Sequence, residues 1–220
     1  MSVVKLKEKG LLIILSGPSG VGKDTICAEL LKTHDNLWLS VSMTTRDPRP
    51  GDVEGESYYF VSKEEFEKNI KANKFYEYAI VHSGQYYGTL KDKIDDKLNK
   101  GIDVILTIDI QGALEMKEKV DDALFIFLVP PTMEILKQRL IDRNTESEDK
   151  LLERFKTAYK EINEISKYNY VVVNDLVEIA TKKVTAILLA EKCRVDRIEQ
   201  VFLHNREEFI HESLIDMIDK

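Results

Sequence analysis

Residues 11–25 read LLIILSGPSGVGKDT, and this stretch decides the fold. It opens with a continuously apolar run, Leu11 to Leu15, as expected of a strand buried on both faces of a sheet. The turn that follows carries the pattern Gly-x-x-x-x-Gly-Lys from Gly17 to Lys23, and a segment with helical period begins at Thr25. A strand, this glycine pattern and a helix, in that order, predict a phosphate-binding P-loop.

Each residue type in this loop has a physical reason to be there. Glycine lets backbone N–H groups turn inward and approach phosphate oxygens with no Cβ in the way. The first helical turn adds its dipole and unpaired amides, and Lys23 supplies a positive charge for the β- and γ-phosphates. The alternative is a glycine-rich turn with an exposed lysine, which the flanking strand and helix disfavour. The residues expected to bind the nucleotide are Gly17, Pro18, Ser19, Gly20, Val21, Gly22, Lys23, Asp24 and Thr25.

Apolar runs recur along the chain and alternate with segments of helical period. The expected buried strands are Leu11–Leu15, Val104–Ile108, Leu124–Val129 and Tyr170–Val173. The expected helices are Thr25–Leu31, Glu134–Ile141, Leu151–Ile165 and Val177–Ala190. Apolar strands that alternate with amphipathic helices are typical of a parallel sheet covered on both faces. We therefore predict an α/β fold with a parallel central sheet flanked by helices.

Two stretches interrupt this alternation. Residues 38–90 are rich in aromatic and turn residues, and they hold one short helix opened by the capping box Ser62-x-x-Glu65. We interpret them as an inserted, mostly antiparallel subdomain. Residues 143–150 are polar throughout and lie between two expected helices, as a mobile lid would. The remaining parts are a core of residues 1–37 and 91–192 and a helical C-terminal extension, residues 193–220.

Composition excludes several classes of protein. The 220 residues carry a net charge of −7, so we expect no general nucleic-acid-binding surface. Cys27 and Cys193 are too few for a disulfide framework and lack metal-ligand spacing, and we expect buried or neutral thiols. The apolar run Leu11–Leu15 is too short to span a membrane, and no cleavable signal precedes it. These features predict a soluble cytoplasmic protein without membrane contact.

The segment SVSMTTRDPRPG, residues 40–51, suggests a second anion site. Its two prolines favour extended geometry for the residues before them. With three residues per turn in such a stretch, Arg46 and Arg49 project from one edge. Two guanidinium groups on one edge can clamp a phosphate dianion. On these residues alone, a solvated arginine pair in a loop stays an open alternative.

Several further motifs follow in a fixed order, and together they resemble the guanylate kinase family over about residues 10–192. After the P-loop come Ser-x-Ser-x-Thr-Thr-Arg-x-x-Arg from Ser40 and Gly-x-x-Tyr-x-Phe from Gly55. The others are Phe-x-Glu-Tyr at 75–78, Tyr-Tyr-Gly-Thr at 86–89, Asp-x-Gln-Gly at 109–112, Pro-Pro at 130–131, an arginine-rich lid and Val-Val-Asn-Asp at 172–175. This resemblance implies a P-loop kinase with an inserted GMP-binding subdomain and a mobile lid.

The resemblance also implies roles for individual residues. The phosphate of GMP would contact Arg46, Arg49, Tyr58 and Tyr87, and the guanine would contact Ser42, Glu77, Thr89 and Asp109. Guanine has N–H donors at N1 and N2 that one carboxylate can accept together, whereas adenine lacks this pair, so a buried Glu77 would reject adenine. Asn174 would join the ATP site. Taken alone, Glu77 and Tyr87 are ordinary polar residues, and it is the ordered set of motifs that favours the functional interpretation.

Three arginines complete the expected catalytic group together with Lys23 and Arg46. Arg139 and Arg143 stand four residues apart at a helix end and share a face, where like charges repel unless an anion lies between them. Arg154 belongs to the next helix. The resemblance places all three around the transferred phosphoryl group when the lid closes; a solvated basic helix end is the alternative.

Two positions depart from the family pattern. The residue after the P-loop lysine is commonly Ser or Thr, whose hydroxyl ligates Mg²⁺, but here it is Asp24. The strand-end position usually held by an acidic residue is here Thr107. The exchange makes Asp24 a candidate contact for Mg²⁺. It leaves open the alternative that phosphates and waters alone hold the metal.

The resemblance implies an ATP:GMP phosphotransferase that uses Mg²⁺ with ATP. Its partners would be the small molecules ATP and GMP, with dGMP as a further acceptor, and it would act as a monomer or homodimer. Two rival interpretations stay open. One is a guanylate-kinase-like domain that binds phosphopeptides without catalysis, although such domains typically have an eroded donor site. The other is a P-loop kinase for another nucleotide.

Overall fold

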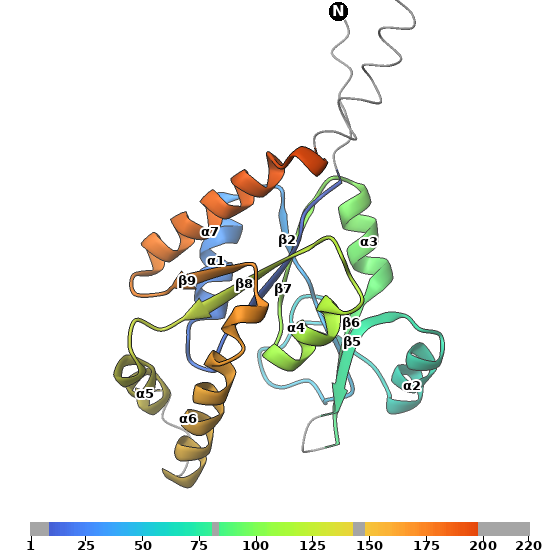
Figure 1. Ribbon diagram of the computed structural model, residues 1–220. Coiled ribbons are helices and arrows are strands. Elements are labelled where there is room, and N and C mark those ends of the chain that lie inside the picture. The colour runs from blue at the N-terminus through green and yellow to red at the C-terminus, as the bar shows by residue number, and fades with distance from the viewer. Residues whose placement is uncertain (1–8, 81–83, 143–147, 198–220) are drawn as a thin grey trace, which may run out of the picture.

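Two β-sheets organise the chain (Figure 1). The structure, a computed structural model, describes residues 9–80, 84–142 and 148–197. A five-stranded sheet has the strand order β2-β7-β1-β8-β9, and a four-stranded sheet has the order β4-β3-β6-β5. The first sheet carries the P-loop at the end of its central strand, and the second is inserted after its edge strand.

All neighbouring strands of the five-stranded sheet run parallel, which confirms the predicted α/β class. In the central pairs, Leu12 of β1 lies beside Val104 of β7 and Ala123 of β8. The predicted strands are present with ends shifted by one residue at most. The strands of this sheet are β1 (Leu12–Ser16), β2 (Leu37–Leu39), β7 (Asp103–Thr107), β8 (Ala123–Val129) and β9 (Tyr170–Val173).

The edge strand β2 shifts one expected boundary. The expected start of the inserted subdomain is residue 38, but Trp38 and Leu39 pair with Val104 and Ile105 in the main sheet. The chain therefore leaves this sheet only after Leu39. A strand of three residues is too short to show a hydrophobic period, so its partner β7 reveals it and its own sequence does not.

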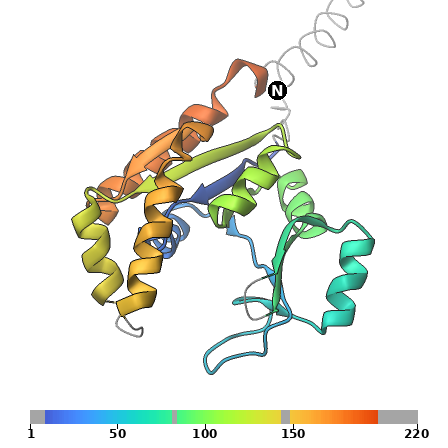
Figure 2. The same cartoon turned by 60° about the horizontal axis from the view of Figure 1, so that its bottom comes forward.

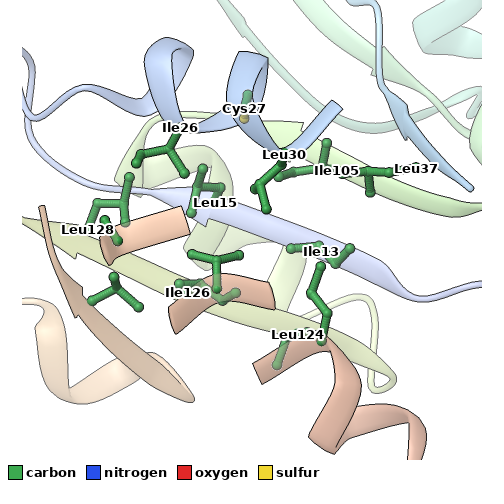
Figure 3. Packing of buried hydrophobic residues seen from close by; sticks show 14 of the residues in the cluster. Ile13, Leu15, Ile26, Cys27, Leu30, Leu37, Ile105, Leu124, Ile126 and Leu128 are labelled. Atoms are coloured by element: carbon green, nitrogen blue, oxygen red, sulfur yellow. The ribbon is translucent and has the colours of Figure 1, made fainter. Parts of the chain in front are cut away.

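Successive side chains of a strand point to opposite faces, so the apolar strands give the main sheet two apolar faces. Helices cover both of these faces. On one face, Ile13 and Leu15 of β1 pack against α1 (Lys23–Thr33) and α7 (Val177–Lys192), as Figure 3 shows. On the other face, Leu12 and Ile14 pack against α3 (Lys91–Asn99) and α4 (Ile110–Lys117). The main sheet is thus the middle layer of three, with β1 fully enclosed.

The four-stranded sheet has its own small core. Met43, Phe66 and Phe75 are buried together, and the rings of Phe66 and Phe75 stack with centroids 4.5 Å apart. The hydroxyl of Ser62 accepts the N–H of Glu65 at 3.2 Å, so the predicted N-cap is confirmed. The elements are β3 (Met43–Thr44), β4 (Tyr59–Phe60), α2 (Lys63–Lys71), β5 (Phe75–Ile80) and β6 (Tyr86–Leu90), and only the β3–β4 pair is parallel.

A helical pair, α5 (Met133–Asp142) and α6 (Glu148–Ile162), projects from the same end of the main sheet as the small sheet does (Figure 2). The pair is held by Leu136, Leu140 and Ala158. The expected lid spanned residues 143–150, but residues 148–150 already belong to α6. Residues 143–147 lie outside the described residues. A 3-10 turn, Ile165–Lys167, joins α6 to β9.

An ion pair links the end of the described chain to the loop before β8. Arg197 donates from Nη2 to Asp122 Oδ1 at 2.6 Å, after α7 has ended at Lys192. Burial raises the pKa of the Cys27 thiol to about 12, as expected for a neutral core thiol, whereas Cys193 is exposed. None of the described helices is long and apolar enough to cross a membrane. The predicted extension beyond residue 197 lies outside the described residues.

Candidate functional site: two facing anion sites

The P-loop backbone requires glycine for conformation and for space. Gly22 is the N-cap of α1 with φ 96°, a left-handed conformation that side chains disfavour. A Cβ on Gly22 would lie 2.6 Å from Asn174 Nδ2, and one on Gly17 would lie 2.4 Å from the Leu128 carbonyl oxygen. The loop is therefore packed tightly against the ends of β8 and β9, which leaves its other side for a ligand.

Asn174 lies just after β9 and binds the backbone of the P-loop. Its Nδ2 donates to the Val21 carbonyl at 2.8 Å, and Arg139 of α5 donates from Nη2 to the Asn174 carbonyl at 3.1 Å. Asn174 is only 3% exposed, yet its Oδ1 accepts no hydrogen bond from any described residue. Because buried amide oxygens are normally hydrogen-bonded, this oxygen, which has almost no accessible surface, is an exception.

The charged residues of the loop, Lys23 and Asp24, lie in the first turn of α1. Lys23 folds back and donates from Nζ to the Gly17 carbonyl at 2.6 Å, which places its ammonium group over the loop. Asp24 and Thr25 are exposed in the first turn of α1. Burial raises the pKa of Tyr58, a residue of the inserted segment, and the charge of the Asp24 carboxylate is a minor further cause.

The second anion site centres on Arg46, which is 7% exposed. Its guanidinium lies over the rings of Tyr58 and Phe60, at 5.2 and 5.6 Å from their centroids. Tyr58 meets Tyr87 edge to face with centroids 5.7 Å apart. The structure thus brings together three of the four predicted phosphate ligands, in an aromatic setting that orients the arginine.

Asp52 holds this cluster together, and our reading of the sequence missed it. Its Oδ2 accepts from Arg46 Nη2 and from the backbone N–H of Arg49, both at 2.8 Å. The Arg49 amide and the Arg46 guanidinium lower the pKa of this carboxyl. The Arg49 side chain is exposed. The only sequence signal is an acidic residue directly after the turn residues Pro50 and Gly51.

A third group of residues forms a buried polar pocket on the small sheet. Glu77 is 8% exposed and lies opposite Thr89 in the antiparallel register. Thr89 Oγ1 donates to Glu77 Oε1 at 2.5 Å. Burial raises the pKa of Glu77, and the nearby Asp109 carboxylate raises it further. Ser42 is half-buried just before β3, without a described side-chain contact.

Asp109 links this pocket to the main sheet. It follows β7 and caps α4, because its Oδ1 accepts the Gly112 N–H at 2.8 Å. Its carboxylate influences the pKa values of both Glu77 in the small sheet and Glu161 in α6. Glu77 and Asp109, the two acidic residues predicted to contact guanine, are therefore neighbours in space although they come from different sheets.

Comparison with known proteins identifies the family of the chain. The family model described as guanylate kinase matches residues 9–191 of the chain. The chain belongs to the guanylate kinase family. A guanylate kinase of Clostridium tetani is 60% identical over 95% of this chain and 100% of its own, and one of Clostridium perfringens is 55% identical over 98% and 100%. The crystal structure of guanylate kinase from Anaplasma phagocytophilum has a TM-score of 0.69 and 36% identity, and covers 87% of this chain and 91% of that one.

The structure describes two of the three arginines expected around the lid, Arg139 and Arg154. Arg139 reaches the P-loop, where Nη1 donates to the Val21 carbonyl at 3.5 Å. Arg154 is exposed on α6. Arg143 lies outside the described residues, so the expected face shared by Arg139 and Arg143 stays a prediction.

A further acidic residue of this guanylate kinase was not foreseen from the sequence. Glu161 of α6 lines a groove of about 600 Å³ between α4 and α6, together with Asp109 and Gln111. Burial raises the pKa of Glu161, whereas the charge of Lys23 and a hydrogen bond from the Ser19 backbone amide lower it. A carboxylate therefore lies beside the anion-binding loop. The position of Glu161 depends on how α6 packs, so no local sequence motif predicts it.

Proposed function

We propose that this chain transfers the γ-phosphoryl group of MgATP to GMP and to dGMP, giving ADP and GDP or dGDP. ATP:GMP phosphotransfer is the activity of the guanylate kinase family, to which the chain belongs. The observation that carries the proposal for this chain is the buried pair of Glu77 and Thr89, in a chain that also has a complete P-loop. The pair has the hydrogen-bonding chemistry that guanine requires.

ATP binds at the main sheet in this proposal. The backbone amides of the P-loop and the dipole of α1 hold its phosphates, and Lys23 exchanges its contact with the Gly17 carbonyl for phosphate oxygens. Asn174, which donates to the Val21 carbonyl of the loop, is assigned to the ATP site through the resemblance to the family. The full set of residues assigned to ATP is Gly17, Pro18, Ser19, Gly20, Val21, Gly22, Lys23, Asp24, Thr25 and Asn174.

GMP binds at the small sheet in this proposal. Arg46 still has N–H groups to offer a phosphate after its bond to Asp52, because a guanidinium carries five donors. Ionised Glu77 accepts from N1 and N2 of guanine, and hydroxyl groups can donate to O6. The residues assigned to GMP are Ser42, Arg46, Arg49, Tyr58, Glu77, Tyr87, Thr89 and Asp109.

Phosphoryl transfer itself needs positioning, charge stabilisation and exclusion of water. Lys23 and Arg46 align the two phosphate groups from opposite sides. Arg139, Arg143 and Arg154 supply further positive charge as the α5–α6 end closes, which shields ATP from hydrolysis. No general base is required, since the phosphate of GMP is already an anionic nucleophile. This division assigns the donor to the P-loop core and the acceptor to the inserted subdomain.

The family generally uses Mg²⁺ with the nucleotide, and the residues present fit this ion. Mg²⁺ prefers oxygen ligands and keeps several waters. Asp24 offers an exposed carboxylate beside Lys23, and Thr107 offers a half-buried hydroxyl at the end of β7. In the described part of the chain, no three His, Cys, Asp or Glu side chains form a metal-binding group, so phosphates and waters would complete the coordination. Bound Mg²⁺ neutralises charge on the β- and γ-phosphate oxygens.

A nucleotide panel tests the proposal. The purified chain is assayed for ADP formation with MgATP and each of GMP, dGMP, AMP, UMP and CMP. Turnover of GMP and dGMP above the other three supports the assignment. Preferred turnover of another acceptor would indicate a different nucleotide kinase, and GMP binding without ADP formation would indicate a non-catalytic binding domain.

A further inference from the structure

Gly112 occupies a position where its backbone does not require glycine. It is buried in the first turn of α4 and has ordinary helical geometry, unlike the glycines of this chain with positive φ. Within a helix, glycine is also a poorer helix former than alanine. Conformation therefore gives no reason for glycine here, and the reason has to lie in the space around it.

That space is filled by two carboxylates. A Cβ on Gly112 would lie 3.3 Å from Glu77 Oε2 and 3.4 Å from Asp109 Oδ1, with Glu77 Cδ at 3.7 Å. The contact with Glu77 is shorter than most Cβ contacts, so Glu77 would have to move by a few tenths of an ångström, whereas the distance to Asp109 is at the limit of ordinary van der Waals contact. Glu77 is held in its place by the hydrogen bond from Thr89 to its other carboxylate oxygen.

We propose that Gly112 is a positioning residue for base selection. Because Gly112 has no side chain, Glu77 of the small sheet can lie against the start of α4, beside Asp109. Both carboxylates can then contact the same guanine. The inference rests on the proposed function, because it assumes that Glu77 and Asp109 bind the base of GMP.

The electrostatics explain why the approach has to be close. Two carboxylates repel each other, and Asp109 accordingly contributes to the raised pKa of Glu77. The amide N–H groups and dipole of the first turn of α4 offset this repulsion, but only over a short distance. A methyl group on Gly112 would hold Glu77 away from these amides. It would also misalign the paired hydrogen bonds that one carboxylate makes to N1 and N2 of guanine.

The variant Gly112→Ala tests the proposal by direct binding measurements on the full chain. Calorimetry should show that the Kd for GMP rises by about tenfold while the Kd for MgATP changes by less than about twofold. Inosine monophosphate lacks the N2 amino group, so the preference for GMP over this nucleotide should fall by at least about threefold. The melting temperature should equal or exceed that of the parent, since alanine is the better helix former.

A double-mutant cycle separates positioning from a general structural role. In a Glu77→Ala background the added methyl group has nothing to displace, so Gly112→Ala should change the Kd for GMP by less than about twofold. Lys117→Ala, an exposed change near the end of the same helix, is the control and should leave GMP binding unaltered.

Three results would overturn the inference. They are parental GMP affinity in Gly112→Ala, an equal loss of MgATP affinity accompanied by a lower melting temperature, and a penalty that persists without the Glu77 side chain. A parent chain that binds no GMP would instead contradict the proposed function, which keeps the two failures distinguishable.

Discussion

Arg46 donates from Nη2 to Asp52 Oδ2 at 2.8 Å, and this ion pair is the most enclosed one among the described residues of the small sheet. The same oxygen accepts the Arg49 amide, so one carboxylate fixes both the side chain of Arg46 and the loop that carries Arg49. A charged group already aligned before the ligand arrives loses less conformational entropy on binding. In the proposed function, Asp52 would therefore organise Arg46 and Arg49 for the phosphate of GMP.

Replacing Asp52 should weaken GMP binding more than it slows turnover. In Asp52→Ala the Arg46 guanidinium loses its orienting partner, and we expect the KM for GMP to rise by at least about tenfold with kcat reduced by less than about threefold. Steady-state kinetics with varied GMP measure both. Asp47→Ala is the control, because Asp47 contacts Arg46 only through its backbone carbonyl. An Asp52→Ala enzyme with the parental KM would contradict this role.

Glu77→Gln should separate function from stability. The amide places a donor opposite a guanine donor, so kcat/KM for GMP should fall by at least about tenfold, equivalent to roughly 1–3 kcal/mol for mismatched buried groups. The outcome is read from kcat/KM in the variant and parent. Kinetics that match the parent would exclude Glu77 as a base-reading residue.

The same variant should be more stable than the parent at neutral and alkaline pH. Burial raises the pKa of Glu77 in the folded chain, so the folded state holds the proton more tightly than the unfolded state does. The stability that this protonation supplies is present in acid and is lost as pH rises through the folded pKa. The variant's advantage in melting temperature should therefore be largest near pH 8 and shrink toward about pH 4. An advantage that grows in acid would contradict the assigned direction.

Removing Arg143 and removing Arg46 should impair different steps, catalysis in the first case and GMP binding in the second. Removing Arg143 should lower kcat by about 10²-fold or more with a modest effect on the Kd for GMP, because its partner charge peaks in the transition state. Removing Arg46 should weaken GMP binding as well, since it lies in the acceptor-phosphate site. Pre-steady-state turnover and equilibrium binding of each Ala variant distinguish the two. Equal losses of GMP affinity with kcat preserved would remove the division of roles.

Asp24 and Thr107 should behave as an exchanged pair if both serve Mg²⁺. Asp24→Ser and Thr107→Asp should each lower kcat/KM, and the double variant should recover much of the loss. Calorimetric binding of ATP at varied Mg²⁺ gives a second measurement that is independent of turnover. Effects that add to within about 0.5 kcal/mol would mean that the two positions do not share the metal.

The sequence by itself determined the fold class and the presence of a P-loop between β1 and α1. Strands such as Leu11–Leu15 are apolar because both of their faces are covered, and this signal is local enough to read from the chain alone. The P-loop is equally local, since its glycines, its lysine and its helix follow one another without interruption. The order of the acceptor motifs predicted the family, and the comparisons confirm it.

Only the tertiary structure decided which residues orient the ligand-binding groups. Asp52 reveals its role through a bond to Arg46, Glu161 through the packing of α6 beside the P-loop, and Gly112 through the approach of Glu77 from the other sheet. The edge strand β2 likewise depends on its partner β7. Each of these features is a contact between residues distant in sequence. Hydrophobic period and local motifs report what one segment prefers, whereas the distance between two segments is set by packing across the whole fold.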